Sequence, residues 1–280
     1  MKRVILDRSA LHGDKFTLLK QSNLSALVAS GTVSMFYTST FIEETLMYAV
    51  RHPEQFLDQW HFLVALNRNR WFKTADRILP IELGRKGRRE DYYCMKVEAV
   101  RKIIFEAPRL ARGNVPQYEI QATLGEVGRN YEIREDFRAR RLQLRKANPK
   151  GDYDFDSYFE ANVDWLINDG IMKYHRNSRG YLKVWQAHRP ELHFTEKYLR
   201  GWFSTLFIPV IDHQIKVDKN DRADAEQLAF LEWADVFVSD DTKFLPRAFR
   251  LLYPGGDKTL LTSQEFIEQL RVGAPASSTL

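Results

Sequence analysis

Acidic residues follow short apolar runs in this 280-residue sequence, and carboxylates arranged in this way can bind a divalent metal ion. Asp7 directly follows the first run, and Asp240 and Asp241 lie just beyond a later one. Glu43 and Glu44 come about one helical turn after a third run. Carboxylates that converge without basic partners repel one another, so such a cluster normally binds a hard cation of the magnesium type. These residues are therefore the first candidates for a metal site.

Each acidic candidate also has a structural interpretation. The aspartates that follow apolar runs can form turns by accepting hydrogen bonds from their own backbone. The Thr40-x-x-Glu43 spacing is that of a helix capping box, which leaves Glu44 as the freer candidate for a metal ligand. Asp221 fits the N-cap of a helix that carries Asp224, although residues three apart share a helix face and both can point into the site.

The candidate site depends on elements that bring these residues together. Apolar and β-branched runs predict strands over residues 3–6, 32–38, 77–82, 234–239 and 258–262. Helical spacing predicts helices over residues 22–29, 41–50, 224–233, 245–252 and 263–270, the last with a capping box of Thr262 and Glu265. Residues 90–200 are expected to be mainly helical. Strands that alternate with helices at both ends of the chain predict an α/β domain, and ligands of such domains bind beyond the carboxyl ends of the parallel strands.

The positive charge of the chain is concentrated in its middle. Residues 61–150 contain 21 Lys and Arg against 11 Asp and Glu, a net charge of +10. The formal net charge of the whole chain is +5, so the remaining residues together have a net charge of −5. Arginine is favoured over lysine at the dense points, and its guanidinium pairs with phosphates through two parallel hydrogen bonds. An arginine-rich stretch is typical of nucleic-acid binding, although a solvated helical surface with paired charges is the alternative.

Composition narrows the class of protein further. With 44% hydrophobic residues the chain can bury a substantial core, and no apolar run approaches the roughly 20 residues of a membrane-spanning helix. Near the N-terminus a charged residue interrupts the apolar run before it reaches the length of the hydrophobic region of a secretory signal. We therefore expect a cytoplasmic protein without a membrane partner. The single cysteine, Cys94, excludes a disulfide framework and a cysteine-based zinc site. Nucleophile-elbow and dinucleotide-binding motifs are absent, which argues against serine hydrolases and dehydrogenases.

Four motifs resemble those of the PIN-domain nucleases. Residues 4–11 resemble the opening strand of that family, an apolar run followed by an aspartate and a nearby hydroxyl residue. Residues 39–46 resemble its second acidic motif, with Glu44 in the position of the ligand glutamate. Residues 224–230 are similar to the third, in which an aspartate opens an alanine-containing helix. Residues 234–244 are similar to the fourth, in which the family pattern matches Ser239, Asp241 and Phe244.

The resemblance implies a PIN-like three-layer α/β/α fold with a central, mainly parallel sheet. It covers residues 1–82 and 205–280, which leaves residues 83–204 as a mainly helical, basic insertion. The implied activity is that of a metal-dependent endonuclease that hydrolyses phosphodiester bonds in RNA with Mg²⁺ or Mn²⁺. The implied metal ligands are Asp7, Glu44, Asp224 and Asp241, with Asp221 at the metal or next to a ligand. Ser239 would orient a carboxylate or the attacking water. Asp240 would interact with the ligand residues without binding the metal itself.

Candidates for nucleic-acid binding come from the basic stretch and from the residue after Asp7. They are Arg8, Arg85, Lys86, Arg88, Arg89, Arg138 and Arg141. Partners besides RNA could be a second copy of the chain or a regulatory protein. Two alternatives stay open: a non-catalytic nucleic-acid-binding or scaffold protein on the same fold, and a toxin-type RNase controlled by a partner protein. The choice between one and two metal ions also stays open.

Overall fold

A computed structural model describes residues 1–67, 70–84, 93–116, 119, 141–146, 153–168, 180–212 and 219–272. Among these residues, four parallel strands form a sheet in the order β2-β1-β3-β4. They are β1 (Lys2–Leu6), β2 (Val33–Phe36), β3 (Val236–Val238) and β4 (Thr259–Leu261). The predicted α/β class and the parallel sheet are confirmed, because each strand lies within or next to a run that the sequence predicts.

The register of the strands aligns their carboxyl ends. Leu6 of β1 pairs with Val238 of β3, and Val238 pairs in turn with Leu261 of β4. Ile5 pairs with Phe36, the last residue of β2. The residues that follow β1, β2 and β3 therefore emerge at the same edge of the sheet, where a parallel sheet binds its ligands.

Helices surround the sheet. Those between the first two strands and in the first half of the chain are η1 (Arg8–Leu11), α1 (Asp14–Gln21), α2 (Leu24–Ala29), α3 (Ser39–Arg51), α4 (Pro53–Leu66), α5 (Ala75–Leu83) and α7 (Val97–Ala111). Those in the second half are α10 (Phe155–Trp165), α11 (Tyr181–His188), η3 (Arg189–Glu191), α12 (His193–Ile211), α13 (Lys219–Ala229), η4 (Phe230–Trp233), α14 (Leu245–Leu252) and α15 (Ser263–Val272). None of the helices in the described ranges has the length and apolar character needed to span a bilayer.

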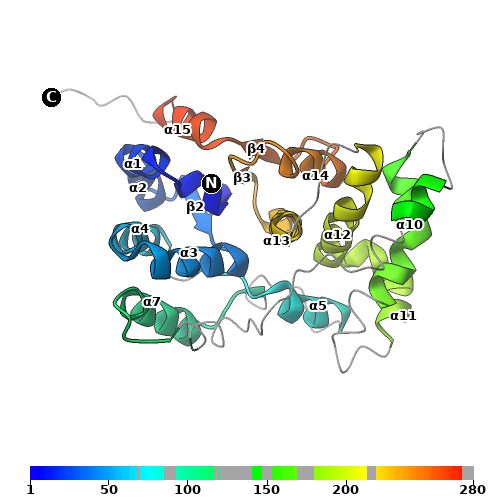
Figure 1. Cartoon of the computed structure of the whole chain (residues 1–280), viewed down its shortest axis with the longest axis horizontal. Helices are drawn as coiled ribbons and strands as arrows, with labels where there is room; N and C mark the ends of the chain where they lie inside the picture. Colours follow the sequence, from blue (N-terminus) through cyan, green and yellow to red (C-terminus); the bar gives the residue numbers. More distant parts are fainter. Residues whose placement is uncertain are drawn as a thin grey trace.

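Two hydrophobic cores lie on opposite faces of the sheet, because successive side chains of a strand point in opposite directions. Val4 and Leu6 of β1 join the core that includes α1, α2, α3, α4, α7 and α15. Ile5 joins the other core, which includes α5 and α10–α14. Figure 1 shows α3, α4 and α7 on one side of the molecule and α10–α12 on the other, with the strands between them. The arrangement is consistent with a three-layer α/β/α fold.

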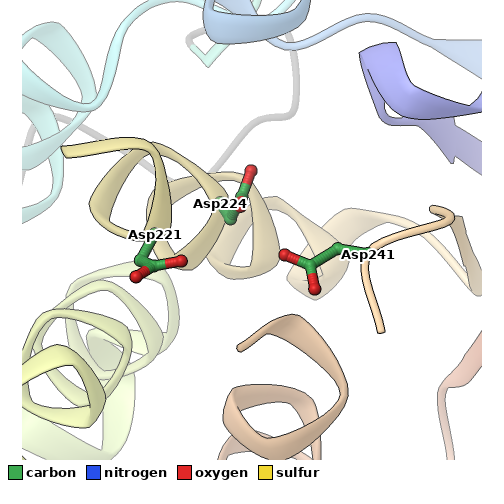
Figure 2. Close-up of side chains that lie close together, drawn as sticks. All are labelled: Asp221, Asp224 and Asp241. Atoms are coloured by element: carbon green, nitrogen blue, oxygen red, sulfur yellow. The ribbon is translucent and has the colours of Figure 1, made fainter. Parts of the chain in front are cut away.

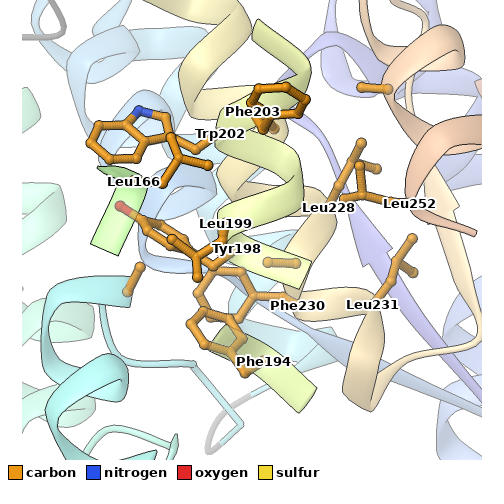
Figure 3. Close-up of a cluster of buried hydrophobic side chains, with 14 of the residues drawn as sticks. Leu166, Phe194, Tyr198, Leu199, Trp202, Phe203, Leu228, Phe230, Leu231 and Leu252 are labelled. Atoms are coloured by element: carbon orange, nitrogen blue, oxygen red, sulfur yellow. The ribbon is translucent and has the colours of Figure 1, made fainter. Parts of the chain in front are cut away.

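The described part of the predicted insertion contributes to both cores, because α7 joins the core of Val4 and Leu6. Phe159 of α10 and Trp185 of α11 belong to the same core as Ile5. The boundary predicted between residues 204 and 205 falls inside α12, which is a continuous helix. Figure 3 shows that side chains of α12, among them Phe194 and Phe203, lie among those of η4, α13 and α14.

A glycine allows α12 and α13 to come into close contact. A Cβ atom placed on Gly201 of α12 would lie 2.7 Å from the carbonyl oxygen of Ala225 in α13. Real Cβ atoms do not approach a backbone oxygen so closely, so any other residue at position 201 would push the helices apart. This contact sets the position of α13, which carries Asp221 and Asp224, against α12.

Three local predictions differ from the structure. The strand predicted over residues 77–82 is wrong, because α5 is a helix whose buried residues Ala75, Ile78, Leu79 and Glu82 recur at helical spacing. The capping box of Thr40 is also wrong. Thr38 is the N-cap of α3, and its Oγ1 accepts a hydrogen bond from the Phe41 N–H at 3.0 Å. Asp221 lies in the first turn of α13 and not at its N-cap, because that helix begins at Lys219.

The capping box predicted at the start of α15 is confirmed. The Thr262 Oγ1 accepts a hydrogen bond from the Glu265 N–H at 3.2 Å, and the Glu265 Oε2 accepts one from the Thr262 N–H at 2.8 Å. This reciprocal pair satisfies two backbone donors at the helix start.

Candidate functional site

Asp7 extends β1 by one residue and carries its carboxylate to the ligand-binding edge of the sheet. Its N–H donates to the Val238 carbonyl at 2.8 Å, which continues the pairing with β3. The Asp7 Oδ2 accepts hydrogen bonds from the hydroxyls of Ser9 and Ser239, the latter at 2.8 Å. Its Oδ1 accepts from the Arg8 N–H at 2.7 Å. The side chain is 5% exposed, so the position of the Asp7 carboxylate is set by these contacts.

Ser239 connects the ends of β1 and β3. Its Oγ donates to Asp7 and also accepts a hydrogen bond from the Asp241 N–H at 3.1 Å. The Asp241 Oδ1 accepts from the Lys243 N–H at 2.6 Å, which closes a turn typical of aspartate after a strand. One buried hydroxyl thus connects Asp7 to the turn that carries Asp241.

The helix α13 supplies two carboxylates to the same region. Asp221 and Asp224 are three residues apart and share a face of the helix, as the sequence predicts. One turn further on, the Gln227 Nε2 donates to the Asp7 Oδ1 at 3.4 Å. The Gln227 Oε1 accepts from the Thr38 Oγ1 at 3.0 Å. Gln227 therefore joins α13 to the ends of β1 and β2.

Three carboxylates come close enough to share one cation. An oxygen from each of Asp221, Asp224 and Asp241 lies within 4.8 Å of the others, and Figure 2 shows all three side chains in one space between α13 and the turn after β3. Carboxylate oxygens are the ligands that Mg²⁺ and Mn²⁺ prefer. Among the described residues, this group has the chemistry and the spacing of a metal site.

Two more carboxylates act on this group through their charge. Burial, together with Asp7 and Glu43, raises the pKa of Glu44 in α3 to about 8, while Arg8 lowers it. Burial also raises the pKa of Asp224 well above its usual value, and Asp7, Glu44, Asp241 and Asp221 raise it further. Like charges at close range disfavour one another, and a cation in the cluster would relieve this repulsion. The residues present therefore fit a bound Mg²⁺ or Mn²⁺.

Only some of the predicted metal ligands belong to the close group of carboxylates. Asp221, Asp224 and Asp241 form the close group, whereas Asp7 and Glu44 interact with it electrostatically from the side of β1 and α3. Asp240 points toward α15 and α1. Its Oδ1 accepts from the Ser263 N–H at 3.1 Å, and its Oδ2 lies 2.9 Å from the Lys15 Nζ. Of the two neighbouring aspartates, Asp241 is the one that joins the cluster.

Arg8 is not the surface residue that the prediction of nucleic-acid binding requires. It is 5% exposed, its Nη2 donates to the Gln59 Oε1 at 2.9 Å, and its guanidinium lies 4.3 Å from the centre of the Tyr48 ring. An RNA strand on the surface cannot reach it in this conformation. Arg141 is half-buried at the start of the described segment 141–146. The predicted residues Arg85, Lys86, Arg88, Arg89 and Arg138 lie outside the described residues.

Sequence reasoning did not identify Gln227 as part of the site. Its position three residues after Asp224, on the same helix face as the two aspartates, is a signal that helical spacing offers. The contact with Thr38 has no such signal, because it joins residues 189 positions apart.

The described part of the basic stretch exposes cations on α7. Arg101, Lys102, Arg109 and Arg112 are exposed, and the Arg109 guanidinium lies 5.5 Å from the centre of the Phe105 ring. Phe105 itself is 68% exposed. It lines a cavity of about 450 Å³ between α4 and α7, whose other lining residues are Trp60, His61, Val64, Ala65, Arg101, Ile104 and Pro108. Exposed arginines beside an exposed aromatic ring are typical of surfaces that bind single-stranded nucleic acid.

Comparison with known proteins identifies no relative. No protein-family model, no curated protein and no solved structure matches this chain. The function is therefore inferred from the geometry of the site.

Proposed function

We propose that this chain is a PIN-like nuclease that uses Mg²⁺ or Mn²⁺ to hydrolyse phosphodiester bonds in RNA. The observation that carries the proposal is the group of Asp221, Asp224 and Asp241, whose carboxylate oxygens lie within 4.8 Å of one another. The group lies beside Asp7, at the edge where parallel sheets bind ligands. Carboxylate clusters that bind hard cations are a common basis for phosphodiester hydrolysis.

The roles of the residues follow from their contacts. Asp221, Asp224 and Asp241 would hold the ion, which when bound lowers the pKa of a water molecule and neutralises charge on the phosphate. Ser239 orients Asp7 and the turn of Asp241 through its single hydroxyl. Gln227 joins α13 to Asp7 through the hydrogen bond from its Nε2. These hydrogen bonds would place the acceptors before the ion binds, and such preorganised placement is what electrostatic catalysis requires.

The substrate proposed is single-stranded RNA, held by the basic surface of α7. This helix packs against α3, and α3 in turn contacts α13, which carries Asp221 and Asp224, so α3 lies between the basic surface and the acidic cluster. The exposed guanidinium groups of Arg101 and Arg109 would contact phosphates, and the ring of Phe105 would stack on a base.

A second candidate function is nucleic-acid binding without catalysis. The observation that favours it is the hydrogen bonding of Asp7, because both of its carboxylate oxygens already accept from protein donors. An aspartate in this state can be a purely structural connection between β1 and β3. The two candidates differ in whether a metal-dependent cut is made.

The test is cleavage of a fluorescently labelled single-stranded RNA in Mg²⁺, in Mn²⁺ and in EDTA. Wild type should cleave only with metal, and Asp224→Asn and Asp241→Asn should each abolish cleavage. Asp58→Asn is the matched control, because Asp58 is an exposed aspartate paired with Lys20 on the surface. If wild type binds RNA but never cuts it with either metal, the nuclease proposal fails and the binding role replaces it.

A further inference from the structure

The buried carboxylate of Asp7 accepts hydrogen bonds on both of its oxygens. Its Oδ1 accepts from the Arg8 N–H at 2.7 Å and from the Gln227 Nε2 at 3.4 Å. Its Oδ2 accepts from the Ser9 N–H at 3.3 Å, from the Ser9 hydroxyl, and from the Ser239 hydroxyl at 2.8 Å. An ionised carboxylate offers about four lone-pair sites, two on each oxygen. Five protein donor groups therefore occupy the acceptor capacity of Asp7.

Asp224, another of the predicted metal ligands, has the opposite surroundings. It is half-buried, and no residue in the described part of the chain donates a hydrogen bond to its carboxylate. Its neighbours are other carboxylates, because oxygens of Asp221 and Asp241 lie within 4.8 Å of one of its own. Burial and these like charges raise the pKa of Asp224. Asp224 therefore has acceptor sites to offer a cation, whereas those of Asp7 are already occupied.

The donors that contact Asp7 belong to the elements that carry the proposed ligands. Gln227 lies on α13, three residues after Asp224. The Ser239 Oγ, which donates to Asp7, accepts a hydrogen bond from the Asp241 N–H at 3.1 Å. One carboxylate thus joins the helix and the turn after β3 that together bring the three ligand aspartates into one space.

Ser9 adds a second connection between Asp7 and the turn after β3. Its hydroxyl donates to Asp7 and accepts a hydrogen bond from the Asp240 N–H at 2.9 Å. The Asp240 Oδ2 lies 2.9 Å from the Lys15 Nζ, which attaches the same residue to α1. The N–H groups of Asp240 and Asp241 therefore each donate to a serine hydroxyl that donates to Asp7.

We infer that Asp7 is a positioning residue and not a metal ligand. Its carboxylate joins α13 to the turn after β3 in the arrangement in which Asp221, Asp224 and Asp241 bind the divalent cation. This inference rests on the proposed function, because it assumes that the acidic group binds metal. It differs from what the resemblance to the PIN-domain nucleases implies, since that resemblance makes Asp7 a ligand.

The experiment measures Mn²⁺ affinity by calorimetry and urea unfolding in EDTA, both on the full chain without RNA. Asp224→Asn should abolish measurable Mn²⁺ binding. It should leave the metal-free chain at least as stable as wild type, because it removes one of several like charges. Asp7→Asn should shift metal-free unfolding to lower urea concentration, because buried donors lose their charged acceptor. It should weaken Mn²⁺ binding by about 10–100-fold, the usual effect of removing a group that orients metal ligands.

Asp235→Asn is the matched control. Asp235 also joins β1 to β3, but at the opposite end of the strands, where its Oδ2 accepts from the Arg3 N–H at 2.8 Å. This variant should unfold at lower urea concentration than wild type and bind Mn²⁺ with unchanged affinity. It therefore separates a loss of stability from a loss of ligand positioning.

The outcomes separate this inference from the proposed function. Absence of Mn²⁺ binding to wild type would overturn both. If wild type binds Mn²⁺, a complete loss of binding in Asp7→Asn, equal to that in Asp224→Asn, would make Asp7 a ligand and overturn the inference alone. A folded Asp7→Asn variant that binds Mn²⁺ as tightly as wild type would also overturn it, because the role of Asp7 would then be structural only.

Ser9→Ala decides if Asp7→Asn does not fold. The substitution removes one hydroxyl donor from Asp7 and leaves its charge in place. If Asp7 positions the ligands, Mn²⁺ binding should weaken by up to about tenfold. Equal or tighter binding is what a ligand released from a competing donor would show, and that result would overturn the inference.

Discussion

The Ser239 hydroxyl donates a hydrogen bond of 2.8 Å to the carboxylate of Asp7, a residue 232 positions earlier in the chain. The contact exists because β1 and β3 are adjacent parallel strands whose last paired residues, Leu6 and Val238, are in register. The next residue of each strand therefore reaches the same edge. The candidate metal centre is built around this contact, since the Asp241 N–H donates to the same hydroxyl.

Ser239→Ala should lower both stability and activity. The substitution removes the hydroxyl donor of a buried carboxylate and leaves the Asp241 N–H without its acceptor, at an expected cost of about 1–3 kcal/mol in the free energy of unfolding. Urea unfolding and RNA cleavage measure the two effects. Ser204→Ala is the control, because its buried hydroxyl donates to the Gly201 carbonyl within α12. A Ser239→Ala variant that unfolds at the same urea concentration as wild type and cleaves RNA at the same rate would contradict the assigned role.

Gly201→Ala should weaken Mn²⁺ binding from a distance. The new Cβ would meet the Ala225 carbonyl oxygen at 2.7 Å, so α13 must shift together with Asp221 and Asp224. Overpacking of this kind costs about 1–3 kcal/mol in the free energy of unfolding. Gly255→Ala is the matched control, since its Cβ would meet only the Asp257 side chain, at 3.9 Å. Calorimetric Mn²⁺ titration of both variants checks the prediction, which is wrong if the two bind equally well.

The stability of the metal-free chain should fall as the pH rises. The pKa of Glu44 is raised from 4.5 to about 8 in the folded chain, by burial first and then by Asp7 and Glu43. Between these values the folded chain holds a proton that the unfolded chain has released, so alkaline pH favours unfolding. Urea unfolding in EDTA across this range measures the slope. Glu44→Gln removes the titrating group and should flatten the slope. Parallel slopes for the two proteins would exclude Glu44 as its source.

Arg101→Ala combined with Arg109→Ala should weaken RNA binding and make it less dependent on salt. Each phosphate contact that is lost lowers the slope of log affinity against log salt by about 0.7 for a single strand. Fluorescence anisotropy with a labelled RNA, in EDTA to prevent cleavage, measures this slope. The control is Arg51→Ala with Arg250→Ala, which removes two exposed arginines from other helices. An equal loss of RNA affinity in both double variants would show that net charge, and not the α7 surface, determines RNA binding.

Local patterns were enough to predict most of the elements that carry the site. The helix predicted over residues 245–252 has the same bounds in the structure, and the capping box of Thr262 and Glu265 is formed. These features depend on interactions between residues a few positions apart, such as the capping of α15. The strand predicted over residues 77–82 is wrong for the complementary reason. Its short apolar run suits a strand and a helix equally well, and packing against the core selects the helix.

The sequence by itself determined which acidic residues follow strands and which share the face of a helix. Only the tertiary structure decided that Asp221, Asp224 and Asp241 form the close group, that Asp240 contacts Lys15, and that Arg8 is buried. Neighbouring residues such as Asp240 and Asp241 have the same local pattern, and the register of β3 and the packing of α13 give them different surroundings. Such contacts join residues far apart in the chain, so they depend on how the layers pack and not on any single segment.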